Sequence, residues 1–117
     1  IVVDVIDDGE AISYDECFAH HTDAEVIINT SPVGMFPKVD ASPVDLTKFP
    51  KCEAVLDVVY NPLTTKFVAQ AKELGMIGVN GLEMLVAQAK YAVEIFLGTE
   101  IDDARIQEIY EDVKELI

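Results

Sequence analysis

Three short stretches of this sequence combine small polar, aromatic and glycine residues in ways that could hold a ligand. The first, NTSPVGMFP at 29–37, interrupts an apolar run abruptly. In an open parallel sheet, ligands lie beyond the carboxyl ends of the strands, so Asn29 and Thr30 mark a possible binding edge. Asn, Ser, Pro and Gly also form ordinary turns, and that alternative stays open at this point.

The second stretch, DVVYNP at 57–62, ends another apolar run and delivers a tyrosine to the same expected edge. The phenol of Tyr60 could hydrogen-bond a polar ligand there. A tyrosine can equally serve to cover the end of a sheet, so both roles are retained for Tyr60.

The third stretch, GLEMLVAQ at 81–88, places Gly81, Met84 and Gln88 three and four residues apart, on one face of a helix. Glycine at a helix start allows close approach of a cofactor, and methionine gives an adaptable apolar wall. The Gln88 amide offers both a donor and an acceptor. By spacing alone, Gln88 is also compatible with a solvent-facing helix position.

These stretches need strands and helices in alternation to bring them together. Apolar runs rich in β-branched residues predict strands, one of them buried on both faces. The predicted strands cover 1–6, 25–29, 54–59 (the fully buried one) and 76–79. We therefore expect a single α/β unit with parallel strands and helices in three layers.

Helix boundaries are predicted from capping residues and glycine stops. The first helix runs from Ser13 to about His20, and the second starts with Asn61-Pro62 as cap and first residue and stops at Gly75. The third opens at Asn80 and runs to about residue 97, with apolar residues so widely spread that we expect it to be largely buried. A last, acidic amphipathic helix is expected over 100–117.

Composition sets limits on the kind of protein. The chain has 117 residues, half of them hydrophobic, which suits one domain with a sizeable core. Its 22 acidic and 8 basic residues give a net charge of −14, which disfavours nucleic acid and membrane surfaces as partners. Two distant cysteines without metal-ligand spacing predict reduced thiols in a cytoplasmic protein and no metal site.

The three stretches, in this order and at these separations, resemble three successive motifs of the shikimate dehydrogenases. The resemblance covers about residues 12–98 and implies a partial Rossmann-like parallel sheet with flanking helices. It also implies the family reaction in aromatic amino acid biosynthesis, the reversible transfer of hydride between NADP(H) and the ring carbonyl of 3-dehydroshikimate, giving shikimate.

Residue roles follow from the same resemblance. Tyr60 and Gln88 match positions that contact the substrate. Four residues match positions around the nicotinamide half of NADP: Thr30, Val58, Gly81 and Met84. The NTSPVGM stretch then corresponds to the strand-end loop that runs beside the nicotinamide.

The chain also departs from the family pattern. No segment resembles the amino-terminal substrate domain that supplies the catalytic lysine and aspartate, and the six glycines include no G-x-G-x-x-G spacing. We therefore expect residues 1–117 to be the carboxyl-terminal part of a shikimate dehydrogenase-like NADP-binding domain, with no catalytic residue and no activity alone. A non-catalytic nucleotide- or shikimate-binding module and a structural interaction module remain as alternatives.

Strand order predicts a further property. In the order 3-2-1-4-5-6, a strand belongs between the strand expected at 1–6 and the one expected at 25–29, and this sequence does not supply it. An unpaired strand edge invites pairing with another chain. We therefore expect a homo-oligomer formed through exposed sheet edges.

Overall fold

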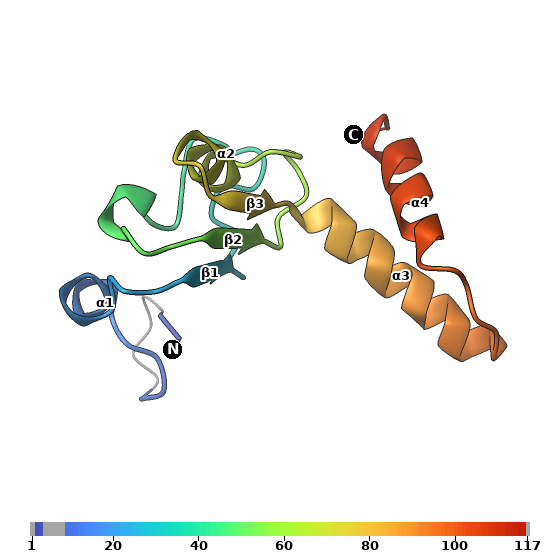
Figure 1. Cartoon of the computed structure of the whole chain (residues 1–117), viewed down its shortest axis with the longest axis horizontal. Coiled ribbons are helices and arrows are strands. Elements are labelled where there is room, and N and C mark those ends of the chain that lie inside the picture. The colour runs from blue at the N-terminus through green and yellow to red at the C-terminus, as the bar shows by residue number, and fades with distance from the viewer. Residues whose placement is uncertain (1, 4–8, 117) are drawn as a thin grey trace.

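The computed structural model describes residues 2–3 and 9–116, and within them the chain forms a parallel sheet with flanking helices (Figure 1). The strand order is β1-β2-β3. The strands are β1 (Val26–Asn29), β2 (Ala54–Asp57) and β3 (Ile77–Val79). The helices are α1 (Tyr14–His20), α2 (Lys66–Glu73), α3 (Gly81–Leu97) and α4 (Ala104–Lys114), with a 3-10 turn η1 (Leu46–Lys48). The predicted α/β class with parallel strands is confirmed.

Local capping signals place several elements where the sequence predicts them. Ser13 precedes α1, and its Oγ accepts a hydrogen bond from the Glu16 amide over 3.1 Å. Asn80 precedes α3, and its Oδ1 accepts from the Leu82 amide over 3.1 Å. Gly98 ends α3 in the left-handed conformation, with φ of 61°, which a glycine adopts without steric cost.

The strand predicted at 1–6 falls largely outside the described residues. Of the residues that are described there, Val3 forms an isolated parallel bridge with Ile12. The predictions at 25–29 and 76–79 correspond to β1 and β3.

The second helix begins later than the sequence predicts. Asn61 and Pro62, expected as its cap and first residue, form a bend joined by a cis peptide bond. The cap is Thr65 instead, whose Oγ1 accepts from the Val68 amide and donates to the Asp57 carboxylate. The buried Asp57 carboxylate at the end of β2 therefore fixes where α2 starts. This contact joins two different elements, so the local residues that signal a helix start do not reveal it.

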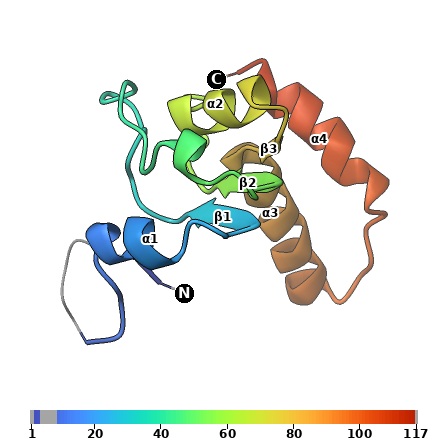
Figure 2. The same cartoon turned by 60° about the vertical axis from the view of Figure 1, so that its left-hand side comes forward.

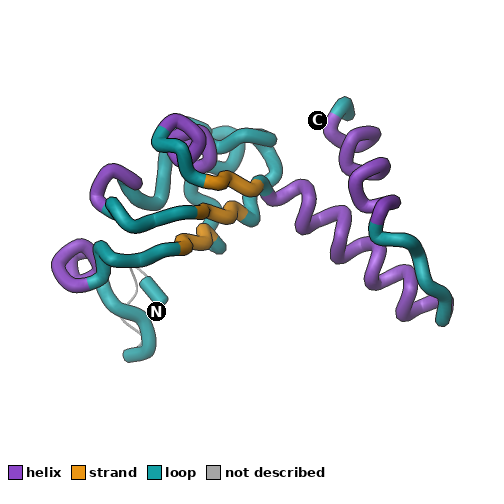
Figure 3. Tube along the Cα trace, in the orientation of Figure 1, coloured by secondary structure: helices purple, strands orange, loops and turns teal. Residues whose placement is uncertain are grey.

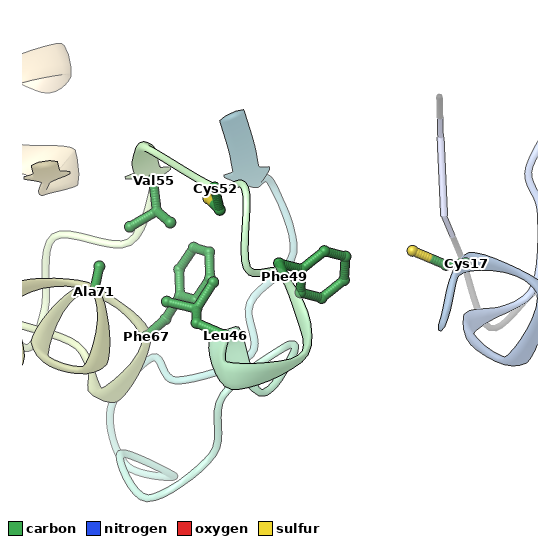
Figure 4. Packing of buried hydrophobic residues seen from close by; sticks show 7 residues of the cluster. All are labelled: Cys17, Leu46, Phe49, Cys52, Val55, Phe67 and Ala71. Carbon is green, nitrogen blue, oxygen red and sulfur yellow. The ribbon is translucent and has the colours of Figure 1, made fainter. Parts of the chain in front are cut away.

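The core lies between η1, α2 and β2 (Figure 4). Its fully covered side chains include Leu46, Phe49, Val55 and Phe67. Two of them, Leu46 and Phe49, belong to the connection between β1 and β2. This connection therefore contributes to the core as well as joining two strands.

The two cysteines are structural residues of this cluster. Cys17 and Cys52 are free thiols and are each 7% exposed. Burial raises the pKa of both thiols. Both side chains therefore behave as small apolar groups.

The face of the sheet opposite α2 is open. Gly78 faces α2, where a Cβ would meet the Val68 side chain at 3.0 Å. Apolar side chains on the other face are exposed, and their exposed fractions are 53% for Val26, 57% for Ile28, 37% for Leu56 and 67% for Ile77. The prediction that the strand at 54–59 is buried on both faces is therefore wrong: within the described residues, one face of β2 is open. The expected third layer is likewise not present among the described residues.

Helices α3 and α4 form a hairpin beside the sheet. Figure 1 shows α3 leaving from the end of β3, and Figure 2 shows α4 returning alongside it. The loop that joins the two helices lies far from the strands, as the colouring by secondary structure in Figure 3 makes clear.

No described helix is long and apolar enough to cross a membrane.

A buried lysine holds this hairpin together. The Nζ of Lys90 lies 2.6 Å from Asp103 Oδ1 and 2.9 Å from Glu94 Oε1. The Glu94 carboxylate also accepts a hydrogen bond from the Ile101 amide over 2.8 Å. These contacts tie the middle of α3 to the start of α4.

The prediction that α3 is largely buried is wrong. Its buried residues are Gly81, Leu82, Val86 and Lys90. Near its carboxyl end, Ile95 and Phe96 are 82% and 88% exposed. The reason is that, in the described part of the chain, this end of α3 lies beyond the sheet and is accompanied by α4 alone.

Candidate functional site

The carboxyl ends of β1 and β2 are joined by two buried polar side chains. Asn29 and Asp57 are partners in the parallel register, and they are only 4% and 3% exposed. The Asn29 Nδ2 donates a hydrogen bond to Asp57 Oδ1 over 3.1 Å. The edge that the sequence marks as a binding edge is thus built on a buried hydrogen bond.

The Asp57 carboxylate accepts from two further segments. Its Oδ1 accepts from the Val59 amide over 3.0 Å, which shapes the turn after β2. Its Oδ2 accepts from Thr65 Oγ1 over 2.7 Å, at the start of α2. A buried carboxylate is costly unless its oxygens are hydrogen-bonded, and here both are.

Asn29 organises the loop that follows β1. Its Oδ1 accepts from the amide and the hydroxyl of Ser31, over 3.1 and 2.6 Å. Its Nδ2 also donates to the Val33 carbonyl over 3.1 Å. Asn29 therefore supports the loop from inside, whereas its neighbour Thr30 is exposed and available to a ligand.

The loops after β1 and β2 contact one another. The Phe36 amide donates to the Asn61 carbonyl over 2.9 Å. Gly34 turns the first loop back with φ of 94°, and a Cβ there would lie 3.0 Å from the Ala41 carbonyl oxygen. The two loops therefore form one continuous surface at the end of the sheet.

The start of α3 packs against the same surface. The Gly81 amide donates to the Val59 carbonyl over 3.1 Å. A Cβ on Gly81 would overlap the carbonyl group of Val58. The structure therefore brings Gly81 and Val58 together. The close approach for which Gly81 is needed is that of the Val58 main chain, whereas sequence reasoning attributed it to a cofactor.

The remaining predicted residues are open to solvent around this junction. Tyr60 is 45% exposed and Met84 is 49% exposed. Gln88 is exposed two turns into α3, on the face that its spacing from Gly81 and Met84 predicts. Each of these side chains is free to meet a ligand, and none is covered by the sheet or by α4.

A separate cavity of about 470 Å³ lies along β1. It is lined by residues of β1 and by the amino-terminal Val2 and Val3. Of the six predicted site residues, only Thr30 lines it. The cavity is also lined by Tyr14 and Cys17 of α1 and by Phe49. The other five predicted residues, Tyr60 and Gln88 among them, do not line it and belong to the sheet-end surface.

Sequence reasoning missed Asp57 and Thr65 as the groups that position this surface. The available signal was a pair of polar residues, Asn29 and Asp57, each ending an apolar strand. Their partnership depends on strand register, which the sequence alone does not reveal. Among the described residues, no group of three or more His, Cys, Asp or Glu side chains is arranged to hold a metal ion.

Comparison with known proteins gives a consistent family likeness. No family model matches the chain. A shikimate dehydrogenase (NADP(+)) from Clostridium perfringens strain SM101 is 41% identical over 103 residues, which are 88% of this chain and 38% of that protein. The chain spans about a third of the length of the curated relatives that it matches.

Solved structures agree with the sequence comparison. A chorismate mutase/shikimate 5-dehydrogenase fusion protein from Clostridium acetobutylicum superposes with a TM-score of 0.82 and 43% identity, over 92% of this chain and 39% of that one. Shikimate 5-dehydrogenase from Thermus thermophilus, solved with NADP(H) and shikimate, gives a TM-score of 0.70 and 30% identity, over 81% and 36%. The resemblance to shikimate dehydrogenases and the Rossmann-like fold are therefore confirmed.

Proposed function

We propose that this chain, a relative of shikimate dehydrogenases, forms the carboxyl-terminal part of an NADP-dependent shikimate dehydrogenase. The proposed reaction is the reversible reduction of 3-dehydroshikimate to shikimate by hydride transfer. The observation that carries the proposal is the junction at the end of the sheet, where the loop after β2 and the start of α3 meet at Val58 and Gly81. Two of the three motif stretches thus touch, and the third is bonded to them through Asn29 and Asp57.

The cofactor proposed for this junction is NADP, held at its nicotinamide half by Thr30, Val58, Gly81 and Met84. Their chemistry fits a flat, weakly polar ring. Met84 offers an exposed, polarisable apolar side chain, and Thr30 offers an exposed hydroxyl. When bound, NADPH supplies the hydride; the part of these residues is to orient the ring and exclude water.

The substrate contacts proposed for this chain are Tyr60 and Gln88. Both are exposed; Tyr60 lies on the loop after β2, and Gln88 lies on α3 two turns after Gly81. A phenol and an amide provide donors and acceptors that match the hydroxyl groups of shikimate. Misplacement of a substrate by about an ångström is costly for hydride transfer, so we assign both residues to substrate orientation.

Proton transfer is not assigned to any residue of this chain. The family resemblance places the catalytic lysine and aspartate in a substrate domain, and the chain spans about a third of its relatives. We propose that the remaining polypeptide supplies these groups and that the enzyme is cytoplasmic. The net charge of −14 supports small-molecule partners over nucleic acid.

The edge of β1 supports a proposal about assembly. The cavity beside it is lined by apolar residues such as Val2, Val3 and Ile27, and β1 is the outer strand of the described sheet. We propose that, in the isolated 117-residue chain, the exposed sheet edges pair with strands of a second copy to give a homo-oligomer. Sedimentation velocity at micromolar concentration tests this, and a well-folded monomer throughout would contradict it.

The test of the proposed activity uses the complete protein encoded by the gene. Shikimate is added with NADP, and formation of NADPH is followed by absorbance, with NAD and quinate as alternative reactants. We expect turnover with NADP and shikimate. Saturable binding of NADP or shikimate without turnover would instead identify a non-catalytic binding module, and no binding of either would identify an interaction module.

A further inference from the structure

The hydrogen bonds at the end of the sheet converge on one side chain. Asp57 is bonded to Asn29 at the end of β1, to Val59 in the loop after β2, and to Thr65 at the start of α2. It is 3% exposed, so its side chain is not accessible to a ligand. Its bonds reach the loops after β1 and β2 directly, and Val59, one of its partners, accepts from the first residue of α3.

The connections run outward from Asp57 in two directions. Through Asn29, which binds Ser31 and Val33, they fix the loop that carries Thr30. Through Val59, whose carbonyl accepts from the Gly81 amide, they fix the start of α3.

Val58 and Tyr60 flank Val59 in the chain, and Met84 and Gln88 follow Gly81 on α3, so the second direction leads to all four of these proposed contacts. Removing the carboxylate would therefore release three segments together.

We propose that Asp57 is a positioning residue, which holds the nicotinamide and substrate contacts in mutual register without touching either ligand. This inference rests on the proposed function, because the register matters for catalysis only if these segments meet NADP and shikimate. A carboxylate suits the task because it accepts several bonds at once, whereas an asparagine has one acceptor oxygen and an alanine has none.

The test compares Asp57→Ala and Asp57→Asn in the complete protein. We expect Asp57→Ala to lower kcat/KM for shikimate about tenfold or more, because loss of orientation is expensive in a hydride transfer. Asp57→Asn should recover part of that loss, since its one acceptor oxygen can still serve the Asn29 and Val59 donors. Amide hydrogen exchange at residues 30–36 and 58–61 should rise in both variants, and more in Asp57→Ala than in Asp57→Asn.

The control is Asp45→Ala. Asp45 is exposed, whereas Asp57 is buried, but its carboxylate likewise accepts from a main-chain amide, a hydroxyl and an amide side chain, namely those of Thr47 and Gln70. Its partners belong to η1 and α2 and not to the sheet-end loops. Asp45→Ala should lower the melting temperature without changing kcat/KM or exchange at 30–36.

Asn29→Ala gives an independent route if Asp57→Ala does not fold. It removes the Nδ2 donor to Asp57 and the Oδ1 acceptor for Ser31, so kcat/KM for shikimate should fall and amide exchange at 30–36 should rise. Wild-type kcat/KM and wild-type exchange in folded Asp57→Ala or Asn29→Ala would overturn the proposal, whatever the melting temperature. If the wild-type protein itself does not turn over shikimate, the proposed function fails, and the exchange measurement alone decides whether Asp57 holds the loops.

Discussion

Gly81, the first residue of α3, lies so close to Val58, the residue after β2, that a Cβ would overlap the Val58 carbonyl group. The Gly81 amide donates to the next carbonyl, that of Val59. A helix therefore starts directly on the main chain of a strand end, and this contact defines the candidate site. Neither partner can give way cheaply, because both are backbone.

Gly81→Ala is expected to destabilise the protein by about 1–3 kcal/mol, the usual cost of overfilling a packed contact. It should also weaken NADP binding, because α3 must shift away from Val58. Thermal unfolding and NADP titration measure both effects. Gly98→Ala is the control: nothing lies within 4 Å of its Cβ position, and its φ of 61° should cost about 1 kcal/mol with no change in NADP affinity. Equal behaviour of the two variants would show that close packing at Gly81 is unimportant.

Gln88→Ala is expected to lower kcat/KM for shikimate by about fivefold, which corresponds to one hydrogen bond of roughly 1 kcal/mol. NADP affinity and melting temperature should stay nearly unchanged, because Gln88 is exposed. Gln107→Ala, an exposed glutamine on α4 that bonds Glu111, is the control and should leave the kinetics unaltered. Wild-type kcat/KM in the Gln88 variant would return this residue to a solvent-facing role.

Tyr60→Phe separates the two roles retained for this tyrosine. The substitution removes the hydroxyl and keeps the ring, so a residue that only covers the sheet end should tolerate it without kinetic effect. If Tyr60 bonds the substrate, kcat/KM for shikimate should fall several-fold while the melting temperature stays within about a degree or two of wild type. A lower melting temperature with intact kinetics would assign Tyr60 to packing.

Lys90→Met is expected to loosen the α3–α4 hairpin. The substitution fills similar space but leaves Asp103 and Glu94 without their cation. Thermal unfolding should show a lower melting temperature at neutral pH. Lys114→Met, which breaks an exposed pair with Glu111 within α4, is the control and should have little effect.

The same cluster predicts a pH dependence of stability. The pKa of Asp103 is lowered, first by its hydrogen bond from Lys90, and the pKa of Glu94 is lowered, first by the Ile101 amide and then by Lys90. Their stabilisation is therefore present above the unfolded-state pKa values of about 4 and is lost as the pH falls through the lower folded-state values. The pKa of Lys90 is raised, first by its hydrogen bond to Asp103, so its contribution is present below the unfolded-state value and is lost in strong alkali.

Melting curves recorded as a function of pH test this assignment. The wild-type melting temperature should drop as the pH falls below about 4, and the drop should be shallower in Lys90→Met, because the coupling between Lys90 and the two carboxylates is gone. An identical acid dependence in both proteins would show that other carboxylates dominate.

The local sequence determined much of this molecule, because short-range chemistry decides it. Ser13, Asn80 and Gly98 set helix ends through bonds and backbone angles within a few residues, and β-branched runs gave the strands of a parallel sheet. The ordered motifs around Thr30, Tyr60 and Gln88 were enough to predict the likeness to shikimate dehydrogenases, since the separations between them are set by the same strands and helices.

Tertiary structure decided what depends on contacts between distant residues. The cap of α2 is Thr65 because the carboxylate of Asp57, 8 residues earlier, accepts a hydrogen bond from its hydroxyl. Asn29 is buried and supports the loop after β1 because Asp57 lies opposite it in the strand register. The burial of α3 was overestimated because apolar spacing indicates a face that can be covered, while what covers it depends on where the helix projects. Gly81 illustrates both levels: its type and place were evident in the sequence, but only the fold shows that the Val58 main chain is what requires it.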